Sequence, residues 1–120
     1  MRRTDTAYLR HVLDAILRVE SYLQGQDEDA FLADSRTQDA VVRQLEIIGE
    51  ATKKVSTGLR SRSPDTPWQD IAGMRDKLIH DYFSVDLHRV WNTATQDLPP
   101  LKASVVRLLE EDQGGDRPPE

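Results

Sequence analysis

The chain contains no cysteine among its 120 residues. This absence excludes a disulfide framework, a thiolate zinc site, an iron–sulfur cluster and a cysteine nucleophile. Long apolar runs are also missing, since none approaches the ~20 residues that a membrane-spanning helix needs. The basic start, residues 1–5, is not followed by the apolar core of a signal peptide. We therefore expect a soluble cytoplasmic protein of bacterial type that does not enter a membrane.

Apolar residues are scarce, at 38% of the chain, whereas charged residues reach 31%. The length suits one domain with a single core, in which roughly two thirds of the unfolded surface is buried. The lean apolar fraction suits an amphipathic helical protein. It equally suits a protein that completes its core by pairing with a second subunit.

The net charge of −5 argues at first sight against a nucleic-acid partner. Residues 110–120, however, hold five acidic residues and one basic residue, so residues 1–109 carry a net charge of only −1. This end of the chain has no aliphatic or aromatic side chain. We therefore expect a folded domain over residues 1–110 and a disordered acidic tail over residues 111–120.

Apolar residues recur at helical spacing along the chain, and no segment shows the sustained alternation of a strand. Long helices are predicted over residues 4–24, 35–59 and 68–82, and from residue 87 to about 109, with a bend or break near residues 97–100. A short helix is predicted within residues 27–34. The predicted N-caps are Thr4 or Asp5, Ser35, Thr66, Asp86 and Asp97. Gly25 is the predicted stop of the first helix. The predicted fold is all-α, an antiparallel up-and-down four-helix bundle with short extra helices.

One stretch, residues 73–83, places several polar groups among core residues within a few helical turns. Asp76 and His80 are four apart, so the carboxylate can orient the imidazole. Arg75 and Tyr82 are seven apart and fall beside the apolar stripe, where an unpaired charge is costly. Two interpretations stay open: a functional site, or a structural ion pair from Arg75 to a glutamate of the preceding long helix, Glu46 or Glu50.

Other features favour simpler interpretations. His11 and His88 are expected to be ordinary surface histidines. Five basic residues between positions 43 and 62 allow a locally basic surface, although a solvated helix face is the simpler interpretation. They are Arg43, Lys53, Lys54, Arg60 and Arg62. On a regular helix Arg75 and His80 diverge by about 140°. They can converge through the long arginine side chain, at a distorted helix end, or across two subunits of a symmetric dimer.

At these residues the chain resembles the HepT-like ribonuclease toxins of the HEPN superfamily, which carry the motif Arg-x4-His-x-Tyr. Here the motif is Arg75, His80 and Tyr82. The flanking segments agree with the resemblance, which covers residues 5–110. They are LEIIGEA (45–51), WQDIAGM (68–74), DLxxVW (86–91) and DLP (97–99).

The resemblance implies a HEPN-like bundle that acts as a homodimer, with the two motifs facing across the interface. It implies a metal-independent endoribonuclease, without a cofactor, that is the toxin of a type II-like toxin–antitoxin module. Arg75 and His80 would be catalytic, Asp76 supporting, and Tyr82 the site that a minimal nucleotidyltransferase antitoxin modifies with AMP. Toxin and antitoxin could form a larger hetero-oligomer.

The residue types fit this chemistry. Cleavage by the ribose 2′-OH needs a proton acceptor, a proton donor and a cation over the transition state. His80 can serve in acid–base steps near neutral pH, and Arg75 can bind phosphate oxygens in a bidentate manner. The alternative function is a catalytically silent HEPN module that binds and regulates a partner nucleotidyltransferase. A structural dimer with a buried arginine network is the third alternative.

Overall fold

The structure is a computed structural model that describes residues 2–74, 76 and 86–115, with side chains as far as residue 112. Within these ranges every regular element is helical, which confirms the predicted all-α class. The helices are α1 (Arg3–Leu23), α2 (Glu28–Leu32), α3 (Ser35–Lys53), α4 (Thr57–Arg60), α5 (Trp68–Ala72), α7 (Leu87–Asn92), the π-helix η1 (Thr93–Asp97) and α8 (Leu98–Gly115). Among the described helices, none is long and apolar enough to cross a bilayer.

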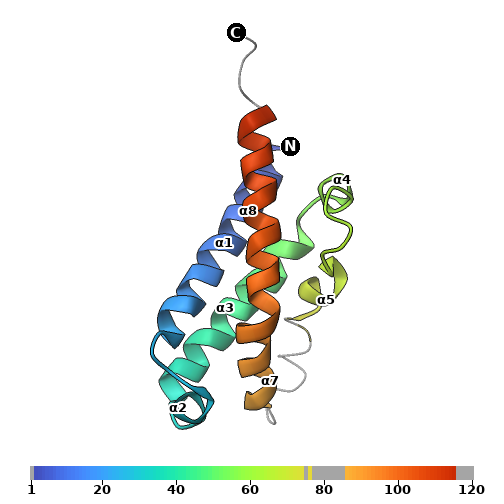
Figure 1. Cartoon of the computed structure of the whole chain (residues 1–120). Coiled ribbons are helices and arrows are strands. Elements are labelled where there is room, and N and C mark those ends of the chain that lie inside the picture. Colours follow the sequence, from blue (N-terminus) through green and yellow to red (C-terminus); the bar gives the residue numbers. More distant parts are fainter. Residues whose placement is uncertain (1, 75, 77–85, 116–120) are drawn as a thin grey trace.

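Three long helices, α1, α3 and α8, dominate the molecule and lie alongside one another (Figure 1). The close pairs are α1 with α3 and α1 with α8, and α5 packs on α3. The short α2 connects α1 to α3 at one end, where it also contacts α7. The third predicted long helix, residues 68–82, is described only at its start, so the four-helix bundle stays a prediction.

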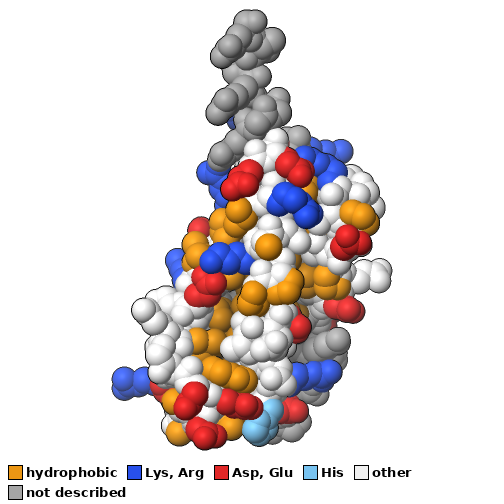
Figure 2. Space-filling model, viewed as in Figure 1, with side chains coloured by type: hydrophobic (Ala, Val, Ile, Leu, Met, Phe, Trp, Pro, Cys, Tyr) orange, Lys and Arg blue, Asp and Glu red, His pale blue; other side chains and the backbone are white. Residues whose placement is uncertain are grey.

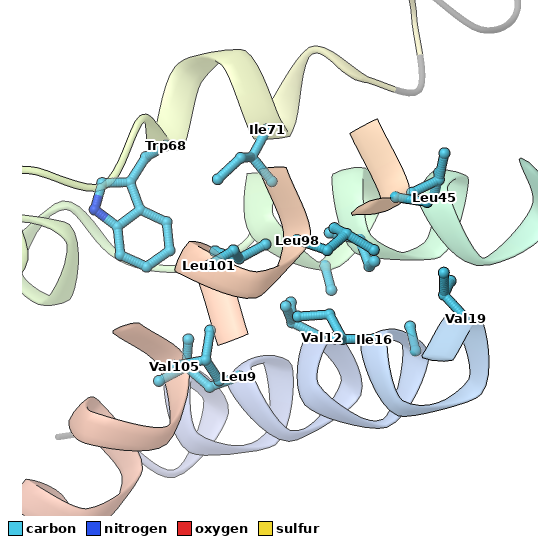
Figure 3. Close-up of a cluster of buried hydrophobic side chains, with 14 of the residues drawn as sticks. Leu9, Val12, Ile16, Val19, Leu45, Trp68, Ile71, Leu98, Leu101 and Val105 are labelled. Carbon is cyan, nitrogen blue, oxygen red and sulfur yellow. The ribbon is translucent and has the colours of Figure 1, made fainter. Parts of the chain in front are cut away.

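The core lies where the apolar stripes of these helices meet (Figure 3). From α1, Leu9 and Ile16 are fully buried, and they share one cluster with Leu98, Leu101 and Val105 of α8. Each such side chain contributes about 1.5–3 kcal/mol when it leaves water. α5 adds Trp68 and Ile71 to the same cluster. α5 ends at Ala72, three residues before Arg75 in the sequence.

The two ends of α1 differ in how well the sequence predicted them. Gly25 follows the helix with φ of +78°, a left-handed conformation that favours glycine, and this confirms the predicted stop. The predicted cap by Thr4 or Asp5 is wrong, because α1 begins at Arg3 and no side chain caps it. Asp5 is instead buried, and its carboxylate accepts hydrogen bonds from the backbone N–H and the hydroxyl of Ser56 at 2.8 and 2.6 Å.

The second long helix is shorter than predicted. α3 ends at Lys53 instead of near residue 59, because Ser56 caps a separate helix, α4, by accepting from the backbone N–H of Leu59. Arg60 donates to the carbonyls of Thr52 and Lys53 and so satisfies acceptors at the end of α3. The predicted cap Ser35 is also wrong: Asp34, one residue earlier, caps α3 through Thr37.

The short helix within residues 27–34 is confirmed as α2, capped by Asp27, with Phe31 fully buried and Leu32 half-buried. Asp86 caps α7 as predicted, by accepting from the backbone N–H of Arg89. The loop that follows α4 differs from the prediction, since Thr66 does not cap α5. Its hydroxyl instead contacts Ser63 at 2.7 Å and donates to Ser104 of α8, which ties the loop to α8.

The predicted bend or break near residues 97–100 is not a break, and Asp97 does not cap a new helix. The chain stays helical from α7 through η1 into α8. The backbone N–H of Leu98 donates to the carbonyl of Thr93, five residues back. Because Pro99 and Pro100 have no N–H to donate, the widened turn sits just before the point where the regular hydrogen-bond ladder loses donors.

The predicted boundary at residue 110 falls inside α8, which continues to Gly115. Asp112 is buried, and it accepts a hydrogen bond from the hydroxyl of Thr6 at 3.2 Å. The first part of the expected tail is therefore helical, and residues 116–120 lie outside the described residues.

Candidate functional site

The candidate site begins where α5 ends. Trp68, Ile71 and Ala72 of α5 are buried, and Met74 packs partly against the same core. Gly73 is the C-cap of α5, and a Cβ at this position would stand 3.3 Å from the carbonyl oxygen of Gln69. α5 is therefore held firmly on α3 immediately before the motif.

Within the motif segment, residues 75–82, the structure describes Asp76, and its carboxylate faces α3. The ammonium of Lys53 lies 3.4 Å from both carboxylate oxygens of Asp76. Both side chains are solvent-exposed, at 36% for Lys53 and 58% for Asp76. An ion pair with this exposure contributes at most about 1 kcal/mol to stability. Its consequence is positional, since it brings the end of α3 next to the motif.

The remaining predicted site residues, Arg75, His80 and Tyr82, lie outside the described residues. Their predicted roles stay predictions, as does the orientation of His80 by Asp76. Lys53 is the site neighbour that sequence reasoning did not single out. In the sequence it stands out only as one of the five basic residues between positions 43 and 62.

The predicted basic surface over residues 43–62 is divided among separate contacts. Arg43 pairs with Glu46 at 3.6 Å, and Arg62 pairs with Glu111 at 3.2 Å. The other three basic residues bind different partners: Lys53 binds Asp76, Lys54 lies over the ring of Tyr8, and Arg60 binds backbone carbonyls. These contacts favour the interpretation as a solvated helix face over a continuous basic patch.

The two other histidines lie on the surface. His11 is exposed on α1, and its ring meets Tyr8 edge-on with 6.2 Å between centroids. His88 of α7 is exposed too, but it has a partner that the sequence did not reveal. Its Nδ1 lies 2.6 Å from a carboxylate oxygen of Glu28 in α2. This hydrogen bond raises the pKa of His88 above its usual 6.5.

Comparison with known proteins identifies the family. The family described as Ribonuclease HepT-like matches residues 12–108. A "Probable ribonuclease HepT" of Thermococcus cleftensis is 42% identical over 108 residues, which cover 90% of this chain and 98% of that protein. A "Putative RNase" of Caldanaerobacter subterraneus is 37% identical over 111 residues, 92% of this chain and 99% of that protein.

A third relative is longer. The "Gamma-glutamylcyclotransferase and putative RNase" of Methanocaldococcus jannaschii is 40% identical over 111 residues, and this chain spans only 50% of its length. No solved structure matches the chain. The matched range contains α5, Asp76 and the whole motif, and it extends from within α1 into α8. On this evidence the chain belongs to the family of HepT-like ribonucleases.

Proposed function

We propose that the chain is a metal-independent endoribonuclease and the toxin of a two-gene toxin–antitoxin module. One observation carries the proposal: the motif residues Arg75, His80 and Tyr82 all stand intact inside the range that matches the family. Relatives that match nearly their whole length to this chain are named ribonucleases. α5, which is anchored in the core, ends at Ala72, three residues before Arg75 in the sequence.

In the proposed reaction the ribose 2′-OH attacks the adjacent phosphorus, and the bond to the 5′-oxygen of the next nucleotide breaks. This leaves a 2′,3′-cyclic phosphate and a 5′-hydroxyl. His80 accepts or donates the transferred proton as a general base or acid near neutral pH. Arg75 binds the phosphate oxygens, where negative charge accumulates in the transition state. Two facing motifs in a homodimer would supply a second histidine, so that one accepts a proton while the other donates one.

The reaction is tested with purified protein and single-stranded RNA in excess EDTA. Wild type is expected to cut the RNA, and His80→Ala is expected to lose the activity. His88→Ala is the matched control, because that histidine lies on α7 and contacts α2. Loss of cutting by both variants, or by neither, would contradict the assignment of His80.

Neutralisation is proposed to occur at Tyr82. AMP joined to its phenolic oxygen would add a phosphate near Arg75, since the two residues are seven apart. Co-expression with a minimal nucleotidyltransferase of the antitoxin type, followed by intact-mass analysis, should show an increase of one or more AMP groups. An adduct that survives Tyr82→Phe would place the modification elsewhere.

The alternative proposal is a catalytically silent module that binds and regulates a nucleotidyltransferase. The two functions differ in what His80→Ala does to growing cells. An active toxin slows growth only while His80 is present, whereas a silent module leaves growth equal with either protein.

A further inference from the structure

A groove runs between the first half of α1 and the second half of α3. Its volume is about 400 Å³. Six of the side chains that line it have aromatic or charged groups: Tyr8, His11, Arg43, Glu46, Glu50 and Lys54. This composition differs from that of the core, and it brings two rings and three kinds of charged group into one surface depression.

The rings and the cation of this groove are already arranged around Tyr8. The His11 ring meets the Tyr8 ring at 80°, and Lys54 Nζ lies 5.7 Å from the Tyr8 centroid. Tyr8 is half-buried and packs against the core, whereas Lys54 is exposed. The groove therefore combines a fixed aromatic ring with a movable ammonium. A nucleotide of single-stranded RNA needs this pair, one for its base and one for its phosphate.

The charges of the groove limit what it can bind. Arg43 lies 3.6 Å from Glu46, so these two charges largely offset each other. Glu50 supplies a further negative charge near Lys54. The groove therefore lacks the broad positive surplus that attracts a duplex backbone. It suits one stacked nucleotide with a single phosphate contact.

The groove also lies close to the motif. Lys54, at its edge, is the chain neighbour of Lys53, and Lys53 contacts Asp76 at 3.4 Å. Asp76 directly follows Arg75. The end of α3 thus borders both the groove and Asp76.

We propose that the groove between α1 and α3 is a subsite for single-stranded RNA, in which Tyr8 stacks on a base and Lys54 binds a phosphate. The inference rests on the proposed ribonuclease function and names how its substrate is held. Tyr8 and Lys54 are binding residues here, and the cleavage step is left to the motif.

Binding is measured by fluorescence anisotropy with full-length protein and a labelled, 2′-O-methylated oligouridylate, which lacks the nucleophilic hydroxyl and cannot be cut. Tyr8→Leu should weaken binding roughly five- to a hundredfold, the range for loss of one base–aromatic stack. Tyr8→Phe keeps the ring and should bind like wild type. Tyr22→Leu is the matched control, because Tyr22 is an exposed tyrosine of the same helix, about 21 Å further along it.

The phosphate contact is tested through salt. Lys54→Gln should lower the slope of log affinity against log salt concentration by about 0.7, as expected for one single-strand phosphate. Lys102→Gln is the control, since its ammonium pairs with Glu20 at 2.9 Å between α8 and α1. An unchanged slope in Lys54→Gln, or an equal change in Lys102→Gln, would overturn the role of Lys54.

Two further results would overturn the subsite. One is Tyr8→Leu binding as wild type does while remaining folded by circular dichroism. The other is Tyr8→Leu turning a wild-type dimer into a monomer, which would make the groove a subunit interface. Because the probe is not cleaved, the outcome is separate from the proposed function. Cleavage is measured separately, with unmodified RNA in EDTA. If binding depends on Tyr8 but unmodified RNA is not cut, the subsite is supported and the ribonuclease function is contradicted. If unmodified RNA is cut but binding does not depend on Tyr8, the ribonuclease function is supported and the subsite is contradicted.

Discussion

At the residue scale, Asp5 shows how a polar side chain near a helix start can serve a distant segment. Asp5 is only 3% exposed, and its carboxylate accepts two hydrogen bonds from Ser56, the N-cap of α4. Local rules suggest an N-cap for such a residue. The actual contact joins positions 51 residues apart and fastens the start of α1 to the turn between α3 and α4.

Removing the Asp5 carboxylate should therefore be costly. Asp5→Ala leaves the partly buried backbone N–H and hydroxyl of Ser56 without their acceptor, so the free energy of unfolding should fall by about 1–3 kcal/mol. Denaturant titration measures this change. Asp14→Ala, at an exposed aspartate of the same helix, should change stability little. Equal losses in the two variants would show that the Ser56 contact is not what stabilises the protein.

A second residue, Asp34, caps α3 one position before the predicted cap, Ser35. Its side chain accepts from the backbone N–H and the hydroxyl of Thr37, and these hydrogen bonds, led by the hydroxyl, lower its pKa below 3.8. Asp34→Ala should therefore destabilise the protein more than Ser35→Ala at neutral pH. The Asp34 contribution should be present above pH 3.8 and disappear as the pH falls through the lowered pKa. Thermal unfolding of both variants across acidic pH tests this, and a greater loss in Ser35→Ala would restore Ser35 as the cap.

At the element scale, α2 and α7 are joined by the contact between Glu28 and His88. The hydrogen bond from Glu28 is the main reason why the pKa of His88 is raised above 6.5. A raised pKa in the folded state stabilises the protein fully below pH 6.5, and this contribution is lost as the pH rises through the raised value. Figure 2 shows acidic side chains gathered at this end of the molecule, which favours a protonated histidine there.

His88→Gln should therefore flatten part of the pH dependence of stability. Wild type should lose stability relative to His88→Gln as the pH rises above 6.5, because the charged imidazole is lost only from wild type. The measurement is the thermal midpoint of both proteins at matched ionic strength. Glu28→Gln should give the same flattening, and a wild-type curve parallel to both variants would contradict the pairing.

Element boundaries show why some helix ends were predictable and others were not. Gly25 and Asp86 act locally, through a left-handed backbone and an N-cap, so the sequence revealed them. The end of α3 depends on two residues outside the helix. Ser56 caps the next helix, α4, and Arg60 donates a hydrogen bond to the carbonyl of Thr52 near the end of α3. The continuity from η1 into α8 depends on a shifted hydrogen bond before two prolines, where local rules predict a stop.

At the scale of the whole molecule, the lean apolar composition raised the expectation of a dimer. The described helices close a core of their own, yet apolar side chains remain at the surface along the seam of α1 and α8 (Figure 2). Leu13, Val106 and Leu109 line a depression of about 550 Å³ there, and Leu17 is 44% exposed. These features leave the subunit arrangement as a prediction.

The predicted dimer can be tested directly by measuring the molecular mass in solution. Sedimentation equilibrium of wild type should give twice the chain mass of 13.7 kDa, since the proposed reaction draws on motifs from two subunits. Arg75→Ala should stay dimeric while losing RNA cleavage. A single-chain mass at every protein concentration would contradict the two-subunit site, and dissociation of Arg75→Ala would assign the arginine a structural role.

The sequence by itself determined the helical class, most of the apolar stripes and the family, because helical periodicity and an ordered motif are local patterns along the chain. It also placed the candidate catalytic residues, Arg75 and His80, on one segment. Only the tertiary structure decided that Lys53 meets Asp76, that Asp5 binds Ser56, and that Tyr8 and Lys54 share a groove. Such pairs depend on how α1, α3 and α5 pack, and packing joins residues that the sequence holds far apart.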